Sequence, residues 1–201
     1  TTCVKPAGTT SLVLGTSSGI HAWHNDYYIR RLRVGKNEPI YNYLKIHNPD
    51  LLADEYFRPH DTAVIEIPQS APKGSILRTE SAFDLLKRVK KVAIEWVKPG
   101  HRKGSNTHNV SATISLKSDE WDKAGKWMWE NRDCYNGLSV LPYDGGTYTQ
   151  APFEDITKKE FEKRVRNLDH INLSNIVEMT DETDLSGELA CAGGSCEITG
   201  L

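Results

Sequence analysis

The sequence predicts an α/β fold with a mainly parallel sheet, and two observations support this prediction. The first is a series of short segments rich in β-branched and aromatic residues, which predict strands at residues 27–34, 62–68, 110–116 and 138–142. The second is that segments with helical spacing of apolar residues alternate with these strands. Such alternation is typical of parallel sheets covered by helices. Because ligands of these folds bind at the carboxyl ends of the strands, the loops after Val4, Val34 and Leu116 are candidate walls of one site.

The clearest predicted helix covers residues 81–98, where Ser81 and Asp84 have the spacing of a reciprocal N-terminal cap. Its buried stripe is predicted to consist of apolar residues at helical spacing: Phe83, Leu86, Val89, Val92 or Ala93, and Trp96. Further helices are predicted at 39–46, from 118 onward and from 157 onward. The helix after 118 carries three tryptophans that we expect to pack in the core, Trp121, Trp127 and Trp129.

The N-terminal turn, Ala7-Gly8-Thr9-Thr10-Ser11, is the stretch with the most features of a binding site. It follows a short apolar segment and precedes an apolar run, an order that predicts strand, tight turn and helix start. Gly8 lets a ligand approach the backbone closely, and the hydroxyl residues offer donors beside the unpaired N–H groups of a helix N-terminus. These features predict an anion site, usually for phosphate. The stretch is not a Walker loop, and an ordinary helix cap is the alternative.

Two further regions are candidates for lining a site. The strand at 110–116 alternates apolar residues with small hydroxyl residues such as Ser111, as expected where a strand faces a cavity. His21 and His24 lie in a polar loop. Metal binding is one alternative for this loop, but no nearby Cys or carboxylate completes a ligand set of the usual spacing. We therefore predict no metal site and favour loop structure or the lining of a substrate pocket.

Charge is distributed unevenly, with a net +6 over residues 1–110 and −8 over residues 111–201. The basic half suits an anionic ligand such as a nucleotide, and a solvated basic face is the alternative. Of its three strand arginines, Arg30, Arg31 and Arg33, we expect at least two to face solvent. The acidic half argues against a nucleic-acid partner. The sequence has no apolar run of membrane-spanning length and no visible signal peptide, so we expect no membrane contact and a cytoplasmic location.

The C-terminal residues, from about Ile176, are mainly acidic and small. Cys191 and Cys196 lie there with four residues between them, a spacing that allows a closed disulfide loop. A terminal pair of this kind can carry electrons between two places by thiol–disulfide exchange. The alternatives are that the two cysteines are part of a metal site or that they have no function, and we favour the redox pair. The four cysteines of the chain are too few for a secreted disulfide scaffold.

Five stretches carry a resemblance to a known family: Val4–His21, Tyr27–Arg31, Asn109–Thr113, Gly137–Gly146 and Gly187–Ile198. Together they resemble the C-terminal part of adenosylcobalamin-dependent (class II) ribonucleotide reductases, in particular the ribonucleoside-triphosphate reductase type. The resemblance covers essentially the whole chain. It implies that residues 1–176 are the C-terminal part of a ten-stranded α/β barrel and that residues 177–201 form a flexible redox tail.

The resemblance also implies roles for particular residues. Substrate phosphates would be held by Ala7, Gly8, Thr9, Thr10 and Ser11. His21 and Ser111, which the loop and strand patterns make candidates for lining the site, lie in the matching stretches. Cys191 and Cys196 would re-reduce the active-site disulfide and would themselves be reduced by thioredoxin. Position 7 is often Ser in the family, and Ala there keeps the backbone donors. The radical-forming cysteine and the reducing pair have no match here, because neither Cys3 nor Cys134 corresponds to a family catalytic position.

The resemblance therefore implies a fragment or subunit that acts with an N-terminal part of the reductase on ribonucleotides, with triphosphates as the expected substrates. Adenosylcobalamin would be bound mostly by that N-terminal part. The chain starts at the phosphate loop with Thr1, which suits a junction left by an intein. The alternative from another class is a stand-alone nucleotide-binding or thiol-relay module without turnover.

Overall fold

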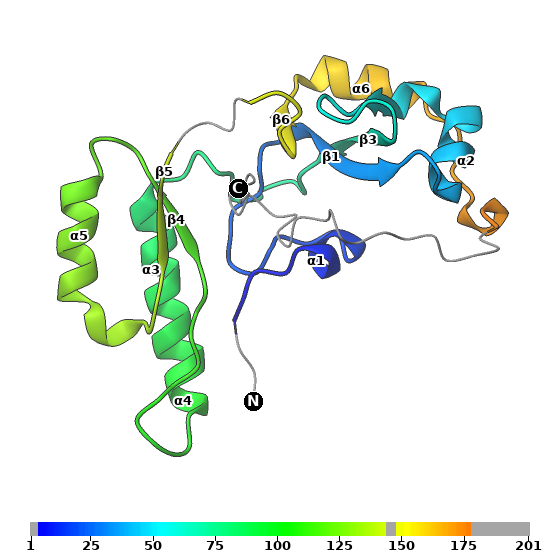
Figure 1. Ribbon diagram of the computed structural model, residues 1–201. Helices are drawn as coiled ribbons and strands as arrows, with labels where there is room; N and C mark the ends of the chain where they lie inside the picture. The colour runs from blue at the N-terminus through cyan, green and yellow to red at the C-terminus, as the bar shows by residue number, and fades with distance from the viewer. Residues whose placement is uncertain (1–3, 144–147, 178–201) are drawn as a thin grey trace. The chain divides into compact units, whose positions relative to one another are not determined.

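The structure is a computed structural model that describes residues 4–143 and 148–177. The described chain divides into two compact units (Figure 1). Unit one contains residues 4–23 and 74–143, and unit two contains residues 24–73 and 148–177. Each unit combines helices and strands, which confirms the mixed α and β content of the prediction. The predicted tail, 177–201, lies almost wholly outside the described residues, so the division at residue 176 stays a prediction.

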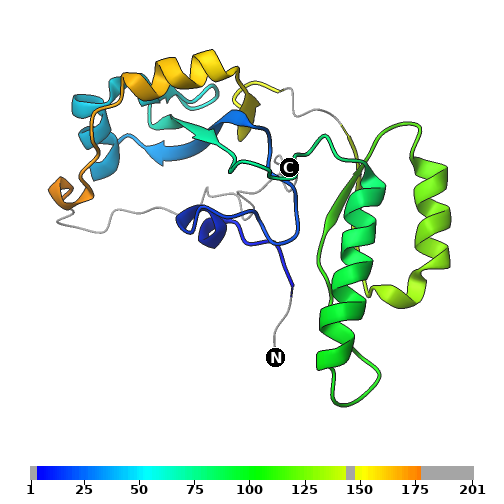
Figure 2. The same cartoon turned by 180° about the vertical axis from the view of Figure 1, so that it is seen from behind.

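Unit one places two helices against a parallel strand pair (Figure 2). Its elements are α1 (Thr9–Val13), α3 (Ala82–Val92), the π-helical η2 (Ala93–Val97), α4 (Lys98–Gly100), β4 (Thr113–Leu116), α5 (Trp121–Glu130), the 3-10 helix η3 (Arg132–Cys134) and β5 (Ser139–Pro142). Strand β4 pairs with β5 in parallel, and Val4 forms a parallel bridge with Val110. The parallel pairing predicted from the sequence is therefore correct in this unit.

The core of unit one lies between these strands and α3 and α5. Leu86, Val89, Val110 and Ile114 are almost completely buried in it. The predicted cap of α3 is confirmed, because the Ser81 side chain accepts from the Asp84 N–H while the Asp84 carboxylate accepts from the Ser81 N–H. Local sequence thus determines where α3 begins.

The predicted buried stripe of α3 is correct up to residue 93 and wrong at Trp96, which is 62% exposed. The helix changes from α to π geometry at Ala93, and a π-turn shifts the angular position of every later residue. Val97 therefore faces the core and Trp96 faces outward. Two of the three tryptophans of α5 also differ from the prediction, since Trp121 and Trp129 are exposed.

Unit two is built on a four-stranded sheet in the order β2-β3-β1-β6. Its elements are β1 (Tyr27–Gly35), α2 (Pro39–His47), the 3-10 helix η1 (Pro49–Leu51), β2 (Leu52–Asp54), β3 (Thr62–Ser70), β6 (Phe153–Asp155), α6 (Lys158–Arg166) and the 3-10 helix η4 (Leu173–Asn175). Pro at the start of α2 and the Thr157 cap of α6 agree with the sequence prediction. One face of the sheet packs with α2 around Val34, Leu44 and Ala63.

The prediction of a mainly parallel sheet is wrong for unit two, where every strand pair is antiparallel. Tyr27 lies opposite Ser70 and Gly35 opposite Thr62, so β1 and β3 pair along their whole lengths. Antiparallel sheets tolerate charged residues on one face, whereas strands of parallel sheets are buried on both sides.

The expectation that at least two of the β1 arginines face solvent is also wrong. Arg31 donates to Glu66 at 2.8 Å, to the Ala151 carbonyl at 3.1 Å and to Glu154, and its side chain is only 9% exposed. Arg30 is buried, with its guanidinium 5.1 Å from the centre of the Phe153 ring, and this burial lowers the pKa of Arg30. The acidic partners lie far away in sequence, so a local pattern does not reveal them.

A buried carboxylate organises the connection between β2 and β3. Glu55 accepts hydrogen bonds from the backbone N–H groups of Phe57 and Arg58, both at 2.7 Å, and one from Arg33 at 3.4 Å. Burial by itself raises the pKa of Glu55, but these hydrogen bonds outweigh it and lower the pKa. The charged carboxylate is therefore part of the native structure of this loop.

Candidate functional site

The N-terminal turn has the geometry predicted for it, with helix α1 starting at Thr9. Ser11 is buried, and its hydroxyl lies 2.8 Å from the Gly8 carbonyl and in contact with the Ala7 carbonyl. Ser11 therefore braces the turn from inside. The N–H groups of the first helical turn have no partner within a helix, so they are the polar groups that the turn can offer to a ligand.

The space beside Gly8 is open, because a Cβ atom placed on it meets no heavy atom within 4 Å. Gly8 itself is exposed. An anion can thus reach the backbone at this point without displacing a side chain.

The segment that follows α1 folds back onto the turn. The Ser18 hydroxyl donates to the Ala7 carbonyl at 3.0 Å. Gly19 has φ +60°, and a Cβ atom on it would lie 2.9 Å from the Lys5 carbonyl oxygen and 3.3 Å from the Cα of Pro6. Only glycine combines that conformation with such a close backbone approach. Ser18 and Gly19 therefore fix the outer side of the turn.

His21 joins this folded-back segment to the strand region at 110–113. Its Nδ1 lies 2.9 Å from the Ser18 carbonyl, and its Nε2 lies 3.0 Å from the backbone nitrogen of Thr113. Because the Thr113 N–H can only donate, Nε2 is the acceptor, and Nδ1 carries the proton that it donates to Ser18. Both ring nitrogens of His21 are thus engaged in hydrogen bonds.

Ser111 is held at the same place by the backbone. Its N–H donates to the Val4 carbonyl at 2.9 Å, one residue beyond the bridge between Val4 and Val110. The structure therefore brings together three of the predicted regions within unit one: the turn at 7–11, His21 and Ser111.

Other predicted residues belong to unit two or lie outside the described residues. His24 belongs to unit two, where its Nε2 lies 3.0 Å from Asp155 and its ring stacks on Phe153 at 5.0 Å. The loop after Val34 also belongs to unit two. Cys191 and Cys196 lie outside the described residues. Within the described part, no group of three or more His, Cys, Asp or Glu side chains has the arrangement of a metal site.

Sequence reasoning missed the contribution of Ser18 and Gly19 to the site. The signal available was the Ser17-Ser18-Gly19 run, which has the composition of a turn that needs a positive φ. Its contact with Lys5 and Pro6 depends on the path of α1, which no local pattern specifies.

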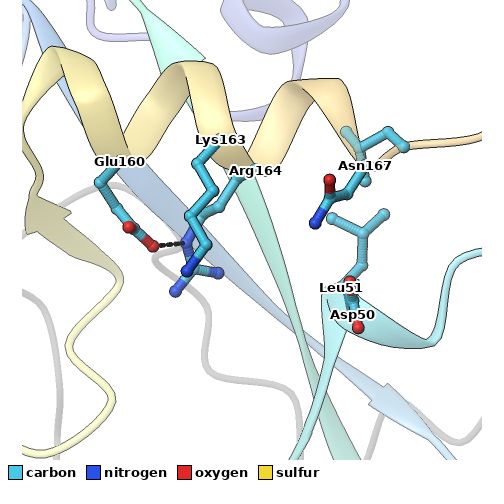
Figure 3. A pocket seen from close by; sticks show the side chains of 7 residues that line it. Asp50, Leu51, Glu160, Lys163, Arg164 and Asn167 are labelled. Atoms are coloured by element: carbon cyan, nitrogen blue, oxygen red, sulfur yellow. Dashed lines mark hydrogen bonds and ion pairs between the residues drawn. The ribbon is translucent and has the colours of Figure 1, made fainter.

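A cavity lies in unit two, between α6 and η1 (Figure 3). It measures about 200 Å³ and is lined by Asp50, Leu51, Glu160, Lys163, Arg164, Asn167 and Leu168. Arg164 is already paired with Glu160 at 2.9 Å and with Glu66 at 3.4 Å. Pockets for drug-sized ligands measure roughly 300–1,000 Å³, so this small and charge-compensated cavity is a weaker candidate than the turn of unit one.

The helices in residues 4–143 and 148–177 are all too short or too polar to cross a lipid bilayer. Cys134, in η3, is partly buried and makes no disulfide.

Comparison with known proteins shows which proteins are similar to this chain in sequence and in fold. No protein-family model matches the chain. The adenosylcobalamin-dependent ribonucleoside-triphosphate reductase of Lactobacillus gasseri is 30% identical over 202 residues, which cover 98% of this chain and 26% of that protein. The enzymes of the same name from Lactobacillus leichmannii and Euglena gracilis are each 28% identical, over 98% and 97% of this chain and 26% of theirs.

A comparison with solved structures gives the same result as the sequence comparison. The crystal structure of a B12-dependent (class II) ribonucleotide reductase matches with a TM-score of 0.71 and 27% identity, over 86% of this chain and 23% of that chain. The chain is homologous to one part of the adenosylcobalamin-dependent ribonucleotide reductases. The resemblance inferred from the sequence is thereby confirmed. The chain spans about a quarter of the length of these reductases.

Proposed function

We propose that this chain works as part of an adenosylcobalamin-dependent ribonucleotide reductase, together with a polypeptide segment that supplies the rest of the enzyme. The observation that carries the proposal is the match along nearly the whole chain, in sequence and in fold, to reductases of this name. The complete enzyme would convert ribonucleotides, with triphosphates as the expected substrates, into deoxyribonucleotides.

In this proposal the turn at 7–11 anchors the substrate phosphates. The carbonyl groups of Ala7 and Gly8 accept from serine hydroxyls. The N–H groups of the first turn of α1, which have no intrahelical partner, would bind the anion. The open space beside Gly8 gives a phosphate access to them. Hydrogen bonds from backbone N–H groups and the positive end of the helix dipole both favour a phosphate at this position.

His21 and Ser111 would form the wall next to the phosphates. His21 keeps the folded-back segment attached to Thr113, so it acts on the turn through Ser18. We assign it a positioning role. Ser111 is partly buried beside Val4 and would line the same site.

Cys191 and Cys196 would relay electrons. In the overall reaction the C2′–O bond of the ribose breaks and a C–H bond forms, two thiols become a disulfide, and the oxygen leaves as water. The reduced tail pair would pass two electrons and two protons to the active-site disulfide by thiol–disulfide exchange. The thioredoxin dithiol would then reduce the oxidised tail pair in the same way.

The cavity in unit two does not fit adenosylcobalamin. It is far too small for a corrinoid, and two of its charged residues, Glu160 and Arg164, are paired with each other. We therefore propose that the cofactor, which supplies the radical in such reductases, is held mostly by the rest of the enzyme. No step assigned to this chain runs through it.

The variant Gly8→Asn tests the phosphate role. Asn is a favourable residue before a helix, and nothing lies within 4 Å of the position, so the fold should be kept. Its side-chain oxygen takes N–H groups that a phosphate needs. We expect at least a tenfold loss of ribonucleotide affinity in the reconstituted enzyme, measured by equilibrium binding. Unchanged affinity would contradict the phosphate role.

A double variant tests the relay. Changing Cys191 and Cys196 together to Ser should abolish turnover with thioredoxin and preserve turnover with a small dithiol that reaches the active site directly. Equal activity of this variant with both reductants would contradict the relay. Binding of ribonucleotide without any deoxynucleotide formation would instead favour a stand-alone nucleotide-binding module.

A further inference from the structure

Arg88, on α3, is hydrogen-bonded to the segment that folds back onto the turn at 7–11. Its Nη1 donates to the Ile20 carbonyl at 2.9 Å. The same guanidinium forms a salt bridge with Glu80, through Nη1 to Oε1 at 3.2 Å and through Nη2 to Oε2 at 2.5 Å. Both side chains are mostly buried, with 21% of Arg88 and 13% of Glu80 exposed. We call Glu80, Arg88 and the Ile20 carbonyl the arginine bridge.

The hydrogen bonds of the arginine bridge depend on the shape of the guanidinium. This group is planar, and two of its N–H groups can pair in parallel with the two oxygens of a carboxylate. Because Nη1 carries two N–H groups, the second can donate to the Ile20 carbonyl at the same time. The Glu80 carboxylate therefore sets the orientation of the donor, and the donor sets the position of the Ile20 carbonyl.

Glu80 and Arg88 both belong to the rigid frame of unit one. Arg88 lies in the sequence of α3 between Leu86 and Val89, which are almost completely buried in the core. Glu80 lies directly before the confirmed cap of the same helix. The Ile20 carbonyl is thus the one member of the arginine bridge that comes from the segment behind the turn. The bridge attaches that segment to α3.

Ile20 lies between two residues that shape the turn at 7–11. On one side is Gly19, where a Cβ atom would lie 2.9 Å from the Lys5 carbonyl oxygen. On the other side is His21, whose ring nitrogens are both engaged in hydrogen bonds. A hydrogen bond to the Ile20 carbonyl fixes the backbone at this junction. It therefore determines how closely Gly19 lies against the residues that lead into the turn.

We propose that Arg88 is a positioning residue of the candidate phosphate site. By holding the Ile20 carbonyl it keeps Gly19 against the residues before the turn at 7–11, and this contact keeps the turn in the conformation that receives phosphate. Arg88 does not touch the ligand, because its guanidinium donates to Glu80 and Ile20. The inference rests on the proposed phosphate role of the turn.

A residue that only stabilised unit one would behave differently. Its replacement would lower the free energy of unfolding and leave the phosphate affinity of the folded chain unchanged. Replacing a positioning residue changes the affinity of the folded chain, even when the new side chain keeps the positive charge. The variant Arg88→Lys makes this distinction, because the Lys ammonium is a point charge that lacks the planar fork needed to hold Glu80 and Ile20 together.

The test uses the complete 201-residue chain and inorganic tripolyphosphate as the probe, at a physiological salt concentration. Saturable shifts of the Gly8 and Thr10 amide resonances of the folded protein measure binding at the turn. We expect Arg88→Lys to weaken this binding about fivefold, as for the loss of one net hydrogen bond. The control Lys87→Gln removes the charge of an exposed neighbour on α3 and should stay within about twofold of the wild-type affinity, because salt screens that charge.

A double-mutant cycle tests whether Arg88 acts through Gly19. In a chain that already carries Gly19→Ala, adding Arg88→Lys should cause no further loss of affinity. In a chain that carries Gly15→Ala, where the Cβ position is open, it should cause the full loss. Wild-type affinity in Arg88→Lys, or equal losses in the two glycine backgrounds, would overturn the inference alone. The absence of any saturable shift in the wild-type chain would contradict the phosphate role of the turn, and this inference with it.

Discussion

The Nε2 atom of His21 lies 3.0 Å from the backbone nitrogen of Thr113, ninety-two residues away in the sequence. This hydrogen bond joins the segment behind the N-terminal turn to the strand region that also carries Ser111. The other ring nitrogen, Nδ1, donates to the Ser18 carbonyl, so both nitrogens of the ring are engaged. The candidate phosphate site is thus shaped by a side chain that need not touch the phosphate.

Replacing His21 by Ala should destabilise unit one by about 1–3 kcal/mol, because the Thr113 N–H loses its partner in a partly buried place. All five tryptophans of the chain lie in unit one, so urea unfolding followed by tryptophan fluorescence reports on this change. The variant His21→Gln keeps an acceptor and a donor on a flexible side chain and should recover part of the loss. Equal stability of wild type and His21→Ala would contradict the bracing role.

Replacing Gly19 by Ala should lower the stability of unit one more than replacing Gly15 by Ala. Both glycines have a positive φ, near +60°, so each alanine variant carries a conformational cost of about 1–2 kcal/mol. Gly15 has open space around its Cβ position, whereas at Gly19 the new atom would lie 2.9 Å from the Lys5 carbonyl oxygen. The difference in unfolding free energy between the two variants therefore measures the cost of that contact.

We expect Gly19→Ala to weaken ribonucleotide binding as well, since the clash displaces Lys5 and Pro6 just before the turn. Gly15→Ala should bind with nearly the wild-type affinity. Calorimetric titration of the reconstituted enzyme measures the ribonucleotide affinity of both variants. Indistinguishable affinities would show that the turn does not depend on the approach of Gly19.

Unit two should lose stability in acid through Glu55. The pKa of Glu55 is lowered in the folded state, so its contribution is fully present above the unfolded value of about 4.3 and disappears as the pH falls through the folded value. Asp61 acts in the same direction, because its hydrogen bonds with Arg58 and Thr62 lower its pKa to about 2. The expected loss therefore begins near pH 4 and continues downward.

The amide resonances of Phe57 and Arg58 give a direct measurement, because both N–H groups donate to Glu55. Their titration midpoint should lie below about 4.3. In the variant Glu55→Gln this titration should vanish and the acid slope of unfolding, followed by far-ultraviolet circular dichroism, should flatten. Glu162→Gln, which removes an exposed carboxylate from α6, controls for the change in net charge. A midpoint at or above the unfolded value would contradict the assignment.

Features encoded by neighbouring residues could be predicted from the sequence. The Ser81–Asp84 cap, the Thr157 cap and the helix start at Thr9 each depend on side chains within three or four positions. The turn at 7–11 could also be predicted from neighbouring residues, whereas its role in phosphate binding and the cavity-facing position of Ser111 stay predictions.

Features that depend on distant partners could not be predicted. The direction of β1 relative to β3 is set by the path of α2 and β2 between them, so the antiparallel pairing was missed. The burial of Arg31 depends on Glu66 and Glu154, which are 35 and 123 residues away. The outward position of Trp96 follows from a π-turn whose sequence, Ala93–Val97, looks like ordinary helix.

The most direct test of the central claim is deoxynucleotide formation by this chain combined with the remaining part of a homologous reductase. The mixture would contain adenosylcobalamin, a ribonucleoside triphosphate and reduced thioredoxin, and the deoxynucleotide would be measured by chromatography. We expect product that depends on every component and falls at least tenfold when the chain carries Gly8→Asn at limiting substrate. No product with any homologous partner, although the chain is folded and mixed in excess, would contradict the account.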